Sequence, residues 1–424
     1  MRPKFLLLAV LVLAGAWGWS RHGAHASAHT VRIETRAPME DIGYEISDAF
    51  ATLNRIRTAM NMAPLEANAA LARAAQFHAD YLVRHRTASH LEYSTRKGFK
   101  GSKPIDRALR AGYRARFVGE NLSTKSANAR TSIDGLFSAI YHRFGFLDPS
   151  FDTVGIGIAQ EKIHPLNSAF VYLMGNSEID RLCGSTAYRG TGRYVYGVCA
   201  DTRHRIRAQT YQQARRAVQE RNPRIVVYPY DGQTNVPPAF YNENPDPLPG
   251  YDVSGFPVSI AFNPRYFRTI KLIDFRLFRS DGSEVTSVQL RNKQNDPNHE
   301  LSRRQFALMP LKRLAYGATY RVMVNYRHRK KHKQKVWTFT VRKPTEALKI
   351  IRNKKQTLTL KRGRGYWLYF PPHNRHDVLG AMRYPADVFV RFIDPNTMRV
   401  VLPPNRRSGF EISGSGRRIR IAVQ

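Results

Sequence analysis

Two histidines and one glutamate in the first half of the chain are residue types that could carry chemistry together. Two imidazoles and a carboxylate can hold a divalent cation with one coordination position left open. The same groups can act as a general acid and a general base. The runs that contain them are Ser89-His90-Leu91-Glu92, Gly119-Glu120-Asn121-Leu122 and Tyr141-His142-Arg143. Spacing alone does not group them, because the chain contains 14 histidines.

The elements that must position these residues follow from hydrophobic periodicity. Apolar residues three and four apart predict helices, and short apolar runs between them predict strands. The expected helices start near Ile46 and then cover Asn68–Val83, Pro104–Ala111 and Asn128–Phe146, and the expected strands are Val154–Ala159 and Phe170–Met174. Helices interleaved with short strands predict a compact α/β layer domain.

Within this domain, residues 50–176 resemble the CAP superfamily, which is named for cysteine-rich secretory proteins, antigen 5 and pathogenesis-related proteins. The likeness is strongest to its bacterial branch. The matching motifs are Leu53-Asn54-Arg55 with Arg57, Pro64-Leu65, Leu71-Ala72-Arg73-Ala74-Ala75 with His78, Ser89-His90, Gly119-Glu120-Asn121, His142-Arg143 and Val154-Gly155-Ile156-Gly157. The resemblance implies an α-β-α sandwich with a central cleft.

The resemblance also implies which residues line that cleft. The family has two histidines and two glutamates there, and His90, Glu120 and His142 match three of the four. The second glutamate would fall near Ala139, so the set is incomplete. The remaining three could still hold Zn²⁺ or another divalent cation, with lower affinity because one negative charge is missing.

Two further residues are secondary candidates for the cleft. Glu92 lies two residues from His90 and could replace the missing carboxylate, and Asn121 follows Glu120 directly. Asn121 is expected to fix a turn rather than to bind a substrate.

Other residue groups give weaker signals. Ser132 and Ser138 lie near His142, but no GxSxG pattern supports a serine nucleophile. His373 and His376 have a spacing that could bind a metal, yet their polar, proline-rich surroundings favour a solvated loop.

The chain after residue 202 changes character. Residues 203–223 predict a basic linker helix. Alternating strands over 224–343, with a hairpin signal at Asp281-Gly282, predict an Ig-like antiparallel β-sandwich. Leu314, Gly317 and Tyr320 have the spacing of a tyrosine corner, which pins such sandwiches. Residues 345–424 predict a small third β module.

Positive charge is concentrated near the C-terminus. The formal net charge is +36, and residues 301–424 hold 29 basic and 5 acidic residues. The densest run is expected at the tip of a hairpin. Its predicted polyanion contacts are Arg327, Arg329, Lys330, Lys331, Lys333 and Lys335. Such a surface indicates an anionic partner, and the alternative is a general basic bias that only keeps the protein soluble.

Residues 1–26 predict a secretory signal peptide. Arg2 and Lys4 precede the apolar run Phe5–Trp19, and Ala24-His25-Ala26 offers a cleavage site. An uncleaved N-terminal anchor is the alternative. The two cysteines, Cys183 and Cys199, are then expected to form a disulfide in an oxidising compartment, with a metal pair or a catalytic thiol as alternatives.

Export and composition restrict the partners. They argue against a nucleic-acid role, and the composition argues against a multi-span membrane protein, a coiled coil and a disordered chain. The expected location is periplasmic, outer-surface-associated or secreted. The expected partners are phospholipid, lipopolysaccharide or cell-wall polymer.

The predicted organisation is α/β plus all-β. Its parts are a signal peptide (1–26), a leader (27–44), a CAP-like domain (45–202), the basic linker helix (203–223), the β-sandwich (224–343) and the small basic β module (345–424).

Three functions remain open. The first is an envelope protein that binds a divalent metal or a lipid-like ligand in its cleft and is docked by its basic β modules. The second is a metal-assisted envelope hydrolase, which the missing carboxylate disfavours. The third is a purely structural or adhesive interaction protein.

Overall fold

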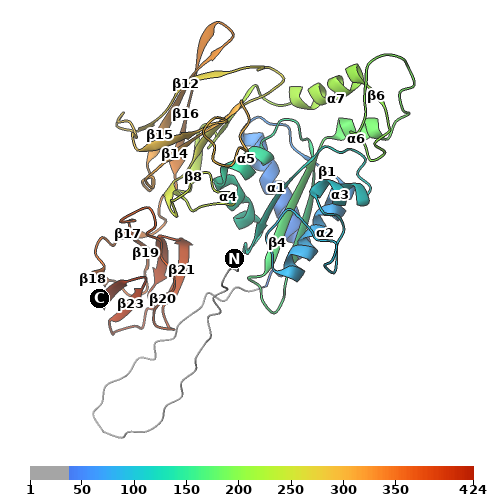
Figure 1. Ribbon diagram of the computed structural model, residues 1–424. Coiled ribbons are helices and arrows are strands. Elements are labelled where there is room, and N and C mark those ends of the chain that lie inside the picture. Colours follow the sequence, from blue (N-terminus) through green and yellow to red (C-terminus); the bar gives the residue numbers. More distant parts are fainter. Residues whose placement is uncertain (1–37) are drawn as a thin grey trace, which may run out of the picture.

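The computed structural model describes residues 38–424. The predicted signal peptide and the first part of the predicted leader lie outside these residues. Along the chain an N-terminal α/β domain is followed by two β-rich units (Figure 1). In the described range, no helix is long and apolar enough to cross a membrane.

The N-terminal domain is built on one four-stranded sheet with the strand order β1-β3-β4-β2. Its strands are β1 (Glu66–Ala67), β2 (Val118–Thr124), β3 (Thr153–Gln160) and β4 (Ser168–Gly175). Its helices are α1 (Ile42–Ala59), α2 (Ala69–His85), α3 (Pro104–Arg110), α4 (Ala129–Ser138) and α5 (Ile140–Phe146). The first three predicted helices and both predicted strands are present, and α1 begins four residues before the expected Ile46.

Helices cover both faces of this sheet, because successive strand residues point to opposite sides. Val171 and Leu173 of β4 share a core with Leu71 and Ala75 of α2. Tyr172, between them, packs in a second core with residues of α1 and α4. The sheet is therefore the middle layer between two helical layers.

Two glycines of the Val154-Gly155-Ile156-Gly157 motif let α2 lie directly on β3. A Cβ atom on Gly155 would lie 2.0 Å from backbone atoms of Leu71 and Ala72, and one on Gly157 would lie 2.3 Å from the backbone of Ala75. Neither distance is possible for a real side chain, so the motif is explained by helix–strand packing.

The predicted helix over Asn128–Phe146 is two helices in the structure. Ala139 has an extended backbone with ψ of 117°, and it ends α4 and begins α5. The break changes the direction of the chain, and it lets α5 contact the first β unit.

A segment rich in basic residues follows β4. It holds α6 (Ser177–Cys183), β5 (Tyr194–Val195), β6 (Ile206–Arg207) and α7 (Ala208–Glu220). The predicted disulfide between Cys183 and Cys199 is confirmed, with an S–S distance of 2.02 Å. The predicted linker helix corresponds to α7 and begins five residues later than expected.

The first β unit contains two four-stranded sheets. One has the order β13-β14-β11-β7 and the other β12-β15-β16-β8. Its strands are β7 (Ile225–Tyr228), β8 (Gln233–Val236), β9 (Ala239–Phe240), β10 (Ser254–Gly255), β11 (Val258–Phe262), β12 (Lys271–Arg279), β13 (Val288–Arg291), β14 (Gln305–Pro310), β15 (Thr319–His328) and β16 (Lys331–Val341). Buried residues of both sheets, such as Ile260 and Trp337, belong to one core. The sheets are not wholly antiparallel, because β8 pairs with β16 in parallel.

The second β unit also contains two four-stranded sheets, with the orders β17-β19-β22-β21 and β18-β24-β23-β20. Its strands are β17 (Ala347–Ile350), β18 (Lys355–Leu360), β19 (Gly365–Tyr369), β20 (Met382–Arg383), β21 (Phe389–Asp394), β22 (Thr397–Val401), β23 (Phe410–Gly414) and β24 (Arg417–Val423). It has a core of its own.

Both β units contain a tyrosine corner. The predicted one is present: the Tyr320 hydroxyl accepts a hydrogen bond of 3.0 Å from the amide of Ala315. In the second unit, the Tyr366 hydroxyl accepts one of 2.9 Å from the amide of Lys361. The spacing Leu-x-x-Gly-x-x-Tyr is the same at 314–320 and 360–366. The second tyrosine corner was therefore also visible in the sequence, although it was not predicted.

Candidate functional site

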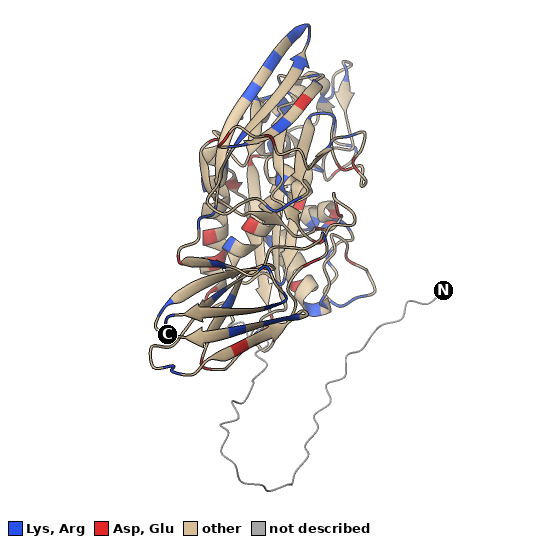
Figure 2. Cartoon of the chain, turned by 90° about the vertical axis from the view of Figure 1, so that its left-hand side faces the viewer, with Lys and Arg blue, Asp and Glu red and all other residues tan. Residues whose placement is uncertain are grey.

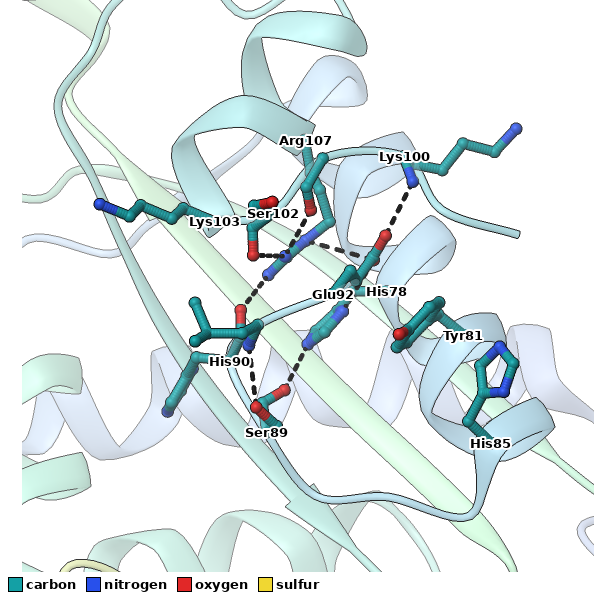
Figure 3. Close-up of polar contacts among 12 residues, drawn as sticks. His78, Tyr81, His85, Ser89, His90, Glu92, Lys100, Ser102, Lys103 and Arg107 are labelled. Carbon is teal, nitrogen blue, oxygen red and sulfur yellow. Dashed lines mark hydrogen bonds and ion pairs between the residues drawn. The ribbon is translucent and has the colours of Figure 1, made fainter. Parts of the chain in front are cut away.

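His90 and Glu120 lie together in a charge cluster that we define as His78, His90, Glu92, Arg107 and Glu120. His78 comes from α2 and Arg107 from α3, while His90 and Glu92 lie in the loop between these helices (Figure 3). Glu120 comes from β2. The side chains of all but His90 are nearly inaccessible, and that of His90 is 47% exposed. The cluster therefore has one member at the surface.

Glu120 is bound on two sides. Its Oε1 lies 2.9 Å from Nδ1 of His90, and Nη2 of Arg107 donates to both carboxylate oxygens at 3.0 and 2.9 Å. Burial alone would raise the pKa of Glu120. The hydrogen bond from His90 and the charge of Arg107 outweigh this effect and hold the pKa below its usual value. Glu120 is thus a buried carboxylate kept ionised by its partners.

His78 forms the second half of the cluster. Its Nε2 lies 2.8 Å from the carbonyl oxygen of Ser89, which can only accept, so Nε2 carries a proton (Figure 3). Its Nδ1 lies 2.9 Å from Oε1 of Glu92. The other oxygen of Glu92 accepts a hydrogen bond of 2.8 Å from the amide of Lys100. Glu92 therefore serves His78 and the loop backbone, and it does not complete a cleft with His142.

Arg107 is the residue of this cluster that the sequence reasoning missed. It is fully buried, and besides Glu120 it donates to the carbonyl oxygens of His90 and Gly101 at 3.1 and 3.2 Å. Its guanidinium provides the positive charge beside Glu120, which is the charge that a bound metal ion would provide there. A sequence signal existed in principle, since an arginine inside a short helix beside a cluster of acids and histidines is a natural counter-charge.

These residues do not fit a divalent cation. Both oxygens of Glu120 already accept hydrogen bonds from Arg107, and a cation there would lie against a fixed guanidinium. Over residues 38–424 no group of three or more His, Cys, Asp or Glu side chains is arranged to hold a metal ion. The predicted site of His90, Glu120 and His142 is therefore not formed as one constellation.

His142 lies on a different side of β2 from Glu120. Glu120 and Asn121 are neighbours on this strand and so point to opposite faces. Glu120 faces α2 and α3, whereas Nδ2 of Asn121 donates to the carbonyl oxygen of His142 on α5 at 2.7 Å. Asn121 thus ties β2 to α5. Strand alternation is the physical reason that the three predicted ligands separate.

His142 is paired instead with a carboxylate from the first β unit. Its Nδ1 lies 3.0 Å from Oε2 of Glu243, and the other Glu243 oxygen accepts a hydrogen bond of 2.7 Å from the amide of Ile140. The carboxylate is almost completely buried, and this burial raises the pKa of Glu243 despite the opposing effect of His142. The family glutamate expected near Ala139 is absent, and His142 is paired instead with Glu243, a carboxylate from outside the N-terminal domain.

The next residue of α5 makes the same kind of contact. Arg143 is fully buried, donates to the carbonyl oxygens of Phe137 and Pro257 at 2.6 and 2.9 Å, and lies over the rings of Tyr228 and Phe256. Burial lowers the pKa of Arg143 to about 10. Helix α5 is therefore the joint between the N-terminal domain and the first β unit.

His376, one of the two histidines in the proline-rich stretch, is paired with a carboxylate. Nδ1 of His376 lies 3.1 Å from Oδ2 of Asp252, and the side chains of His376 and Asp252 are each about half exposed. The solvated-loop interpretation agrees with this exposure.

The second candidate site is the cationic hairpin, which we define as β15 and β16 with their turn. It projects from the body of the molecule, and its Lys and Arg residues gather toward the tip (Figure 2). The turn falls at Arg329 and Lys330, as the sequence predicted. Cross-strand pairing places Tyr326 opposite Lys333, Arg327 opposite His332 and His328 opposite Lys331.

The two faces of the hairpin differ because alternate residues point to opposite sides. Lys331 and Lys333 share one face with Tyr326 and His328. Arg327 lies on the other face, opposite Lys271 of β12. The six predicted polyanion contacts are therefore divided between two surfaces.

Comparison with known proteins agrees with the resemblance. Residues 50–171 match the sequence model of CAP, the cysteine-rich secretory protein family, so the resemblance is confirmed for this region. No curated protein matches the chain.

Among solved structures, the chain is similar to an extracellular protein containing a SCP domain from Bacillus anthracis str. Ames. The identity is 18%, the match covers 31% of this chain and 40% of that chain, and the TM-score is 0.27. The chain thus spans less than half the length of that protein. An outer surface protein from Borrelia burgdorferi is also 18% identical, with 32% of this chain and 94% of that chain covered and a TM-score of 0.29.

Proposed function

We propose that this protein, whose residues 50–171 form a CAP domain, is an exported binding protein of the bacterial cell envelope. In this proposal the cationic hairpin docks it on anionic envelope material. The observation that carries the proposal is the charge of the hairpin: Arg329, Lys330, Lys331 and Lys333 surround its tip, and no acidic residue occurs within Arg327–Lys335. Because like charges repel, such a tip gains stability when an anionic surface neutralises it.

The CAP domain supports this surface rather than supplying a metal centre. Its α5 is buried against the first β unit through Arg143 and His142, and Arg313 of that unit donates to Asp394 of the second β unit at 2.6 and 2.8 Å. These contacts hold the three parts together, so the hairpin has a defined position. We do not propose the metal-assisted hydrolase, because Glu120 is bound by Arg107 and His142 is bound by Glu243.

The docking is tested by co-sedimentation of the full chain with vesicles of phosphatidylglycerol and of phosphatidylcholine. Binding to the anionic vesicles is expected at about 50 mM salt and should fall steeply toward about 500 mM, because salt screens exposed charges. A variant with Arg329, Lys330, Lys331 and Lys333 changed to Gln should lose most of the binding.

The control removes four exposed cations of the second β unit, namely Lys354, Lys361, Arg362 and Arg364, again by change to Gln. Both variants carry the same net charge. Equal loss of binding in the two variants would show that total charge, and not the hairpin, decides the docking.

A further inference from the structure

A recess lies beside the tip of the cationic hairpin, at one end of the first β unit. Its cavity volume is about 770 Å³, and three segments line it: the start of β7, the loop that follows β11, and the hairpin. This volume lies within the range of small-molecule sites, which is about 300–1,000 Å³. It is much larger than a bare phosphate ion requires.

The floor of the recess is aromatic. Phe267 is 3% exposed, and its ring packs against those of Phe262 and Tyr326 at centroid distances of 5.2 and 6.4 Å. Tyr266 is half-buried beside it. A ligand that fills this space needs a body with apolar or ring surface in addition to its charged group.

The rim of the recess is cationic. Arg224, Arg329, Lys330, Lys331 and Lys333 line it, and no acidic residue does. The guanidinium of Arg224 lies 4.7 Å from the centre of the Tyr266 ring, so its apolar face is occupied while its N–H edge stays available. In the described part of the chain, none of these five cations takes part in an ion pair, whereas Arg265, next to Tyr266 in the sequence, is paired with Glu220.

One histidine reports the potential inside the recess. The ring of His328 lies 4.7 Å from that of Phe267. Burial lowers the pKa of His328, and the charges of Arg329, Arg224 and Lys333 lower it further. The three cations therefore act on one imidazole although Arg224 lies about a hundred residues earlier in the chain than the hairpin.

We propose that this recess binds a phosphomonoester group carried by a sugar of an envelope glycan. The inference rests on the proposed function, and it names the ligand of the docking surface. A phosphomonoester carries about 1.5 to 2 negative charges at neutral pH and three acceptor oxygens, which suits several convergent cations better than a singly charged phosphodiester does. The sugar ring supplies both C–H surface for the aromatic floor and hydroxyl groups for the half-open rim.

A flat bilayer is the weaker candidate for this site. A planar surface would meet the projecting tip and would use the cations of both hairpin faces alike. The recess lies on one face only, with Lys331 and Lys333 on its side and Arg327 on the other. A phosphate on a flexible glycan can enter such a recess, whereas a headgroup held in the plane of a membrane cannot do so without leaving that plane.

The test is titration of the full chain with glucose 6-phosphate in a buffer free of phosphate, followed by calorimetry and by the NMR signals of His328. We expect binding that glucose alone does not show, and a rise in the pKa of His328 when the anion is bound, because a nearby negative charge favours the protonated imidazole. The variant Lys331→Ala/Lys333→Ala should bind about tenfold more weakly, the size of a loss of about 1.4 kcal/mol.

The matched control is Lys271→Ala/Arg327→Ala. It removes the same charge from the opposite face of the same sheet. Its affinity should change by less than about threefold, because exposed charges beyond about 10 Å are screened. Equal weakening in the two variants would overturn the inference, and so would equally strong binding of inorganic phosphate, since the sugar would then contribute nothing.

The outcomes separate this inference from the proposed function. Binding of phosphatidylglycerol vesicles without binding of glucose 6-phosphate would leave the docking proposal standing and remove the sugar phosphate. Binding of neither probe would remove both.

Discussion

His142 of the CAP domain and Glu243 of the first β unit form a hydrogen bond of 3.0 Å across the boundary between the two parts. The same carboxylate accepts the amide of Ile140. The histidine that resembles a family cleft residue is thus used in this chain to join two domains.

Loss of Glu243 should weaken this joint. Glu243→Ala leaves the amide of Ile140 and the ring of His142 without their acceptor in a buried place, which should lower the free energy of unfolding by about 1–3 kcal/mol. Glu243→Gln should cost less, because its amide oxygen can still accept from Ile140. Urea unfolding at neutral pH measures both.

The control for Glu243 is another carboxylate–histidine pair between parts of the chain. Asp252 and His376 are both half exposed, so Asp252→Ala should cost less than about 1 kcal/mol. If both alanine variants are equally stable, the joint does not depend on the buried carboxylate.

Arg143 should be intolerant of lysine. Its guanidinium donates to the carbonyl oxygens of Phe137 and Pro257 and also lies over the rings of Tyr228 and Phe256. Lysine is a point charge without this planar fork. Arg143→Lys should therefore lower the free energy of unfolding by about 1–3 kcal/mol, as measured by denaturant titration, whereas Arg181→Lys in an exposed pair should have almost no effect.

Glu120 should make stability depend on pH in the acid range. Its pKa in the folded protein lies below the ordinary value of 4.5, so its contribution is present above the unfolded-state pKa and is lost as the pH falls through the folded-state pKa. At pH 7, Glu120→Gln should cost about 1–3 kcal/mol, because Arg107 loses the carboxylate that accepts its two hydrogen bonds and keeps only Glu92, 3.7 Å away, as a counter-charge.

The measurement is the difference in unfolding free energy between the wild type and Glu120→Gln from neutral to acid pH. The difference should begin to shrink as the pH falls below 4.5, where the unfolded chain takes up a proton, and most of it should be lost below the folded-state pKa, where the carboxyl group is neutral in both states. A difference that stays constant or grows toward acid pH would contradict an ionised Glu120.

Zinc binding should not depend on the predicted ligands. His90 lies beside Glu120 and Arg107, and His142 lies beside Glu243, so no shared metal site links the two histidines. Zinc titrations of the wild type and of His90→Ala/His142→Ala should give the same stoichiometry. One equivalent of zinc lost in the double variant would restore the metal hypothesis.

Local sequence patterns predicted the elements well and the connections between them poorly. The Val154–Gly157 motif and the corner at Tyr320 each act over a few residues or one contact, and such signals are visible in a sequence. Strand β2, which carries Glu120, was not predicted; it is an edge strand that pairs only with β4. The break at Ala139 was missed since alanine favours helix, and only the docking of α5 explains it.

The sequence by itself determined the CAP region, the disulfide, the hairpin tip and the position of the positive charge. Each of these depends on residue types at short spacings along the chain.

Only the tertiary structure decided which charged side chains contact one another. Alternation along β2 sent Glu120 toward Arg107 and Asn121 toward α5, and the folding of the first β unit brought Glu243 to His142. Register and alternation also divided the hairpin cations, so that two lysines face a recess and Arg327 faces away. Side-chain direction along a strand and contacts between distant segments are set by packing, and that is why the spacing of residues could not reveal them.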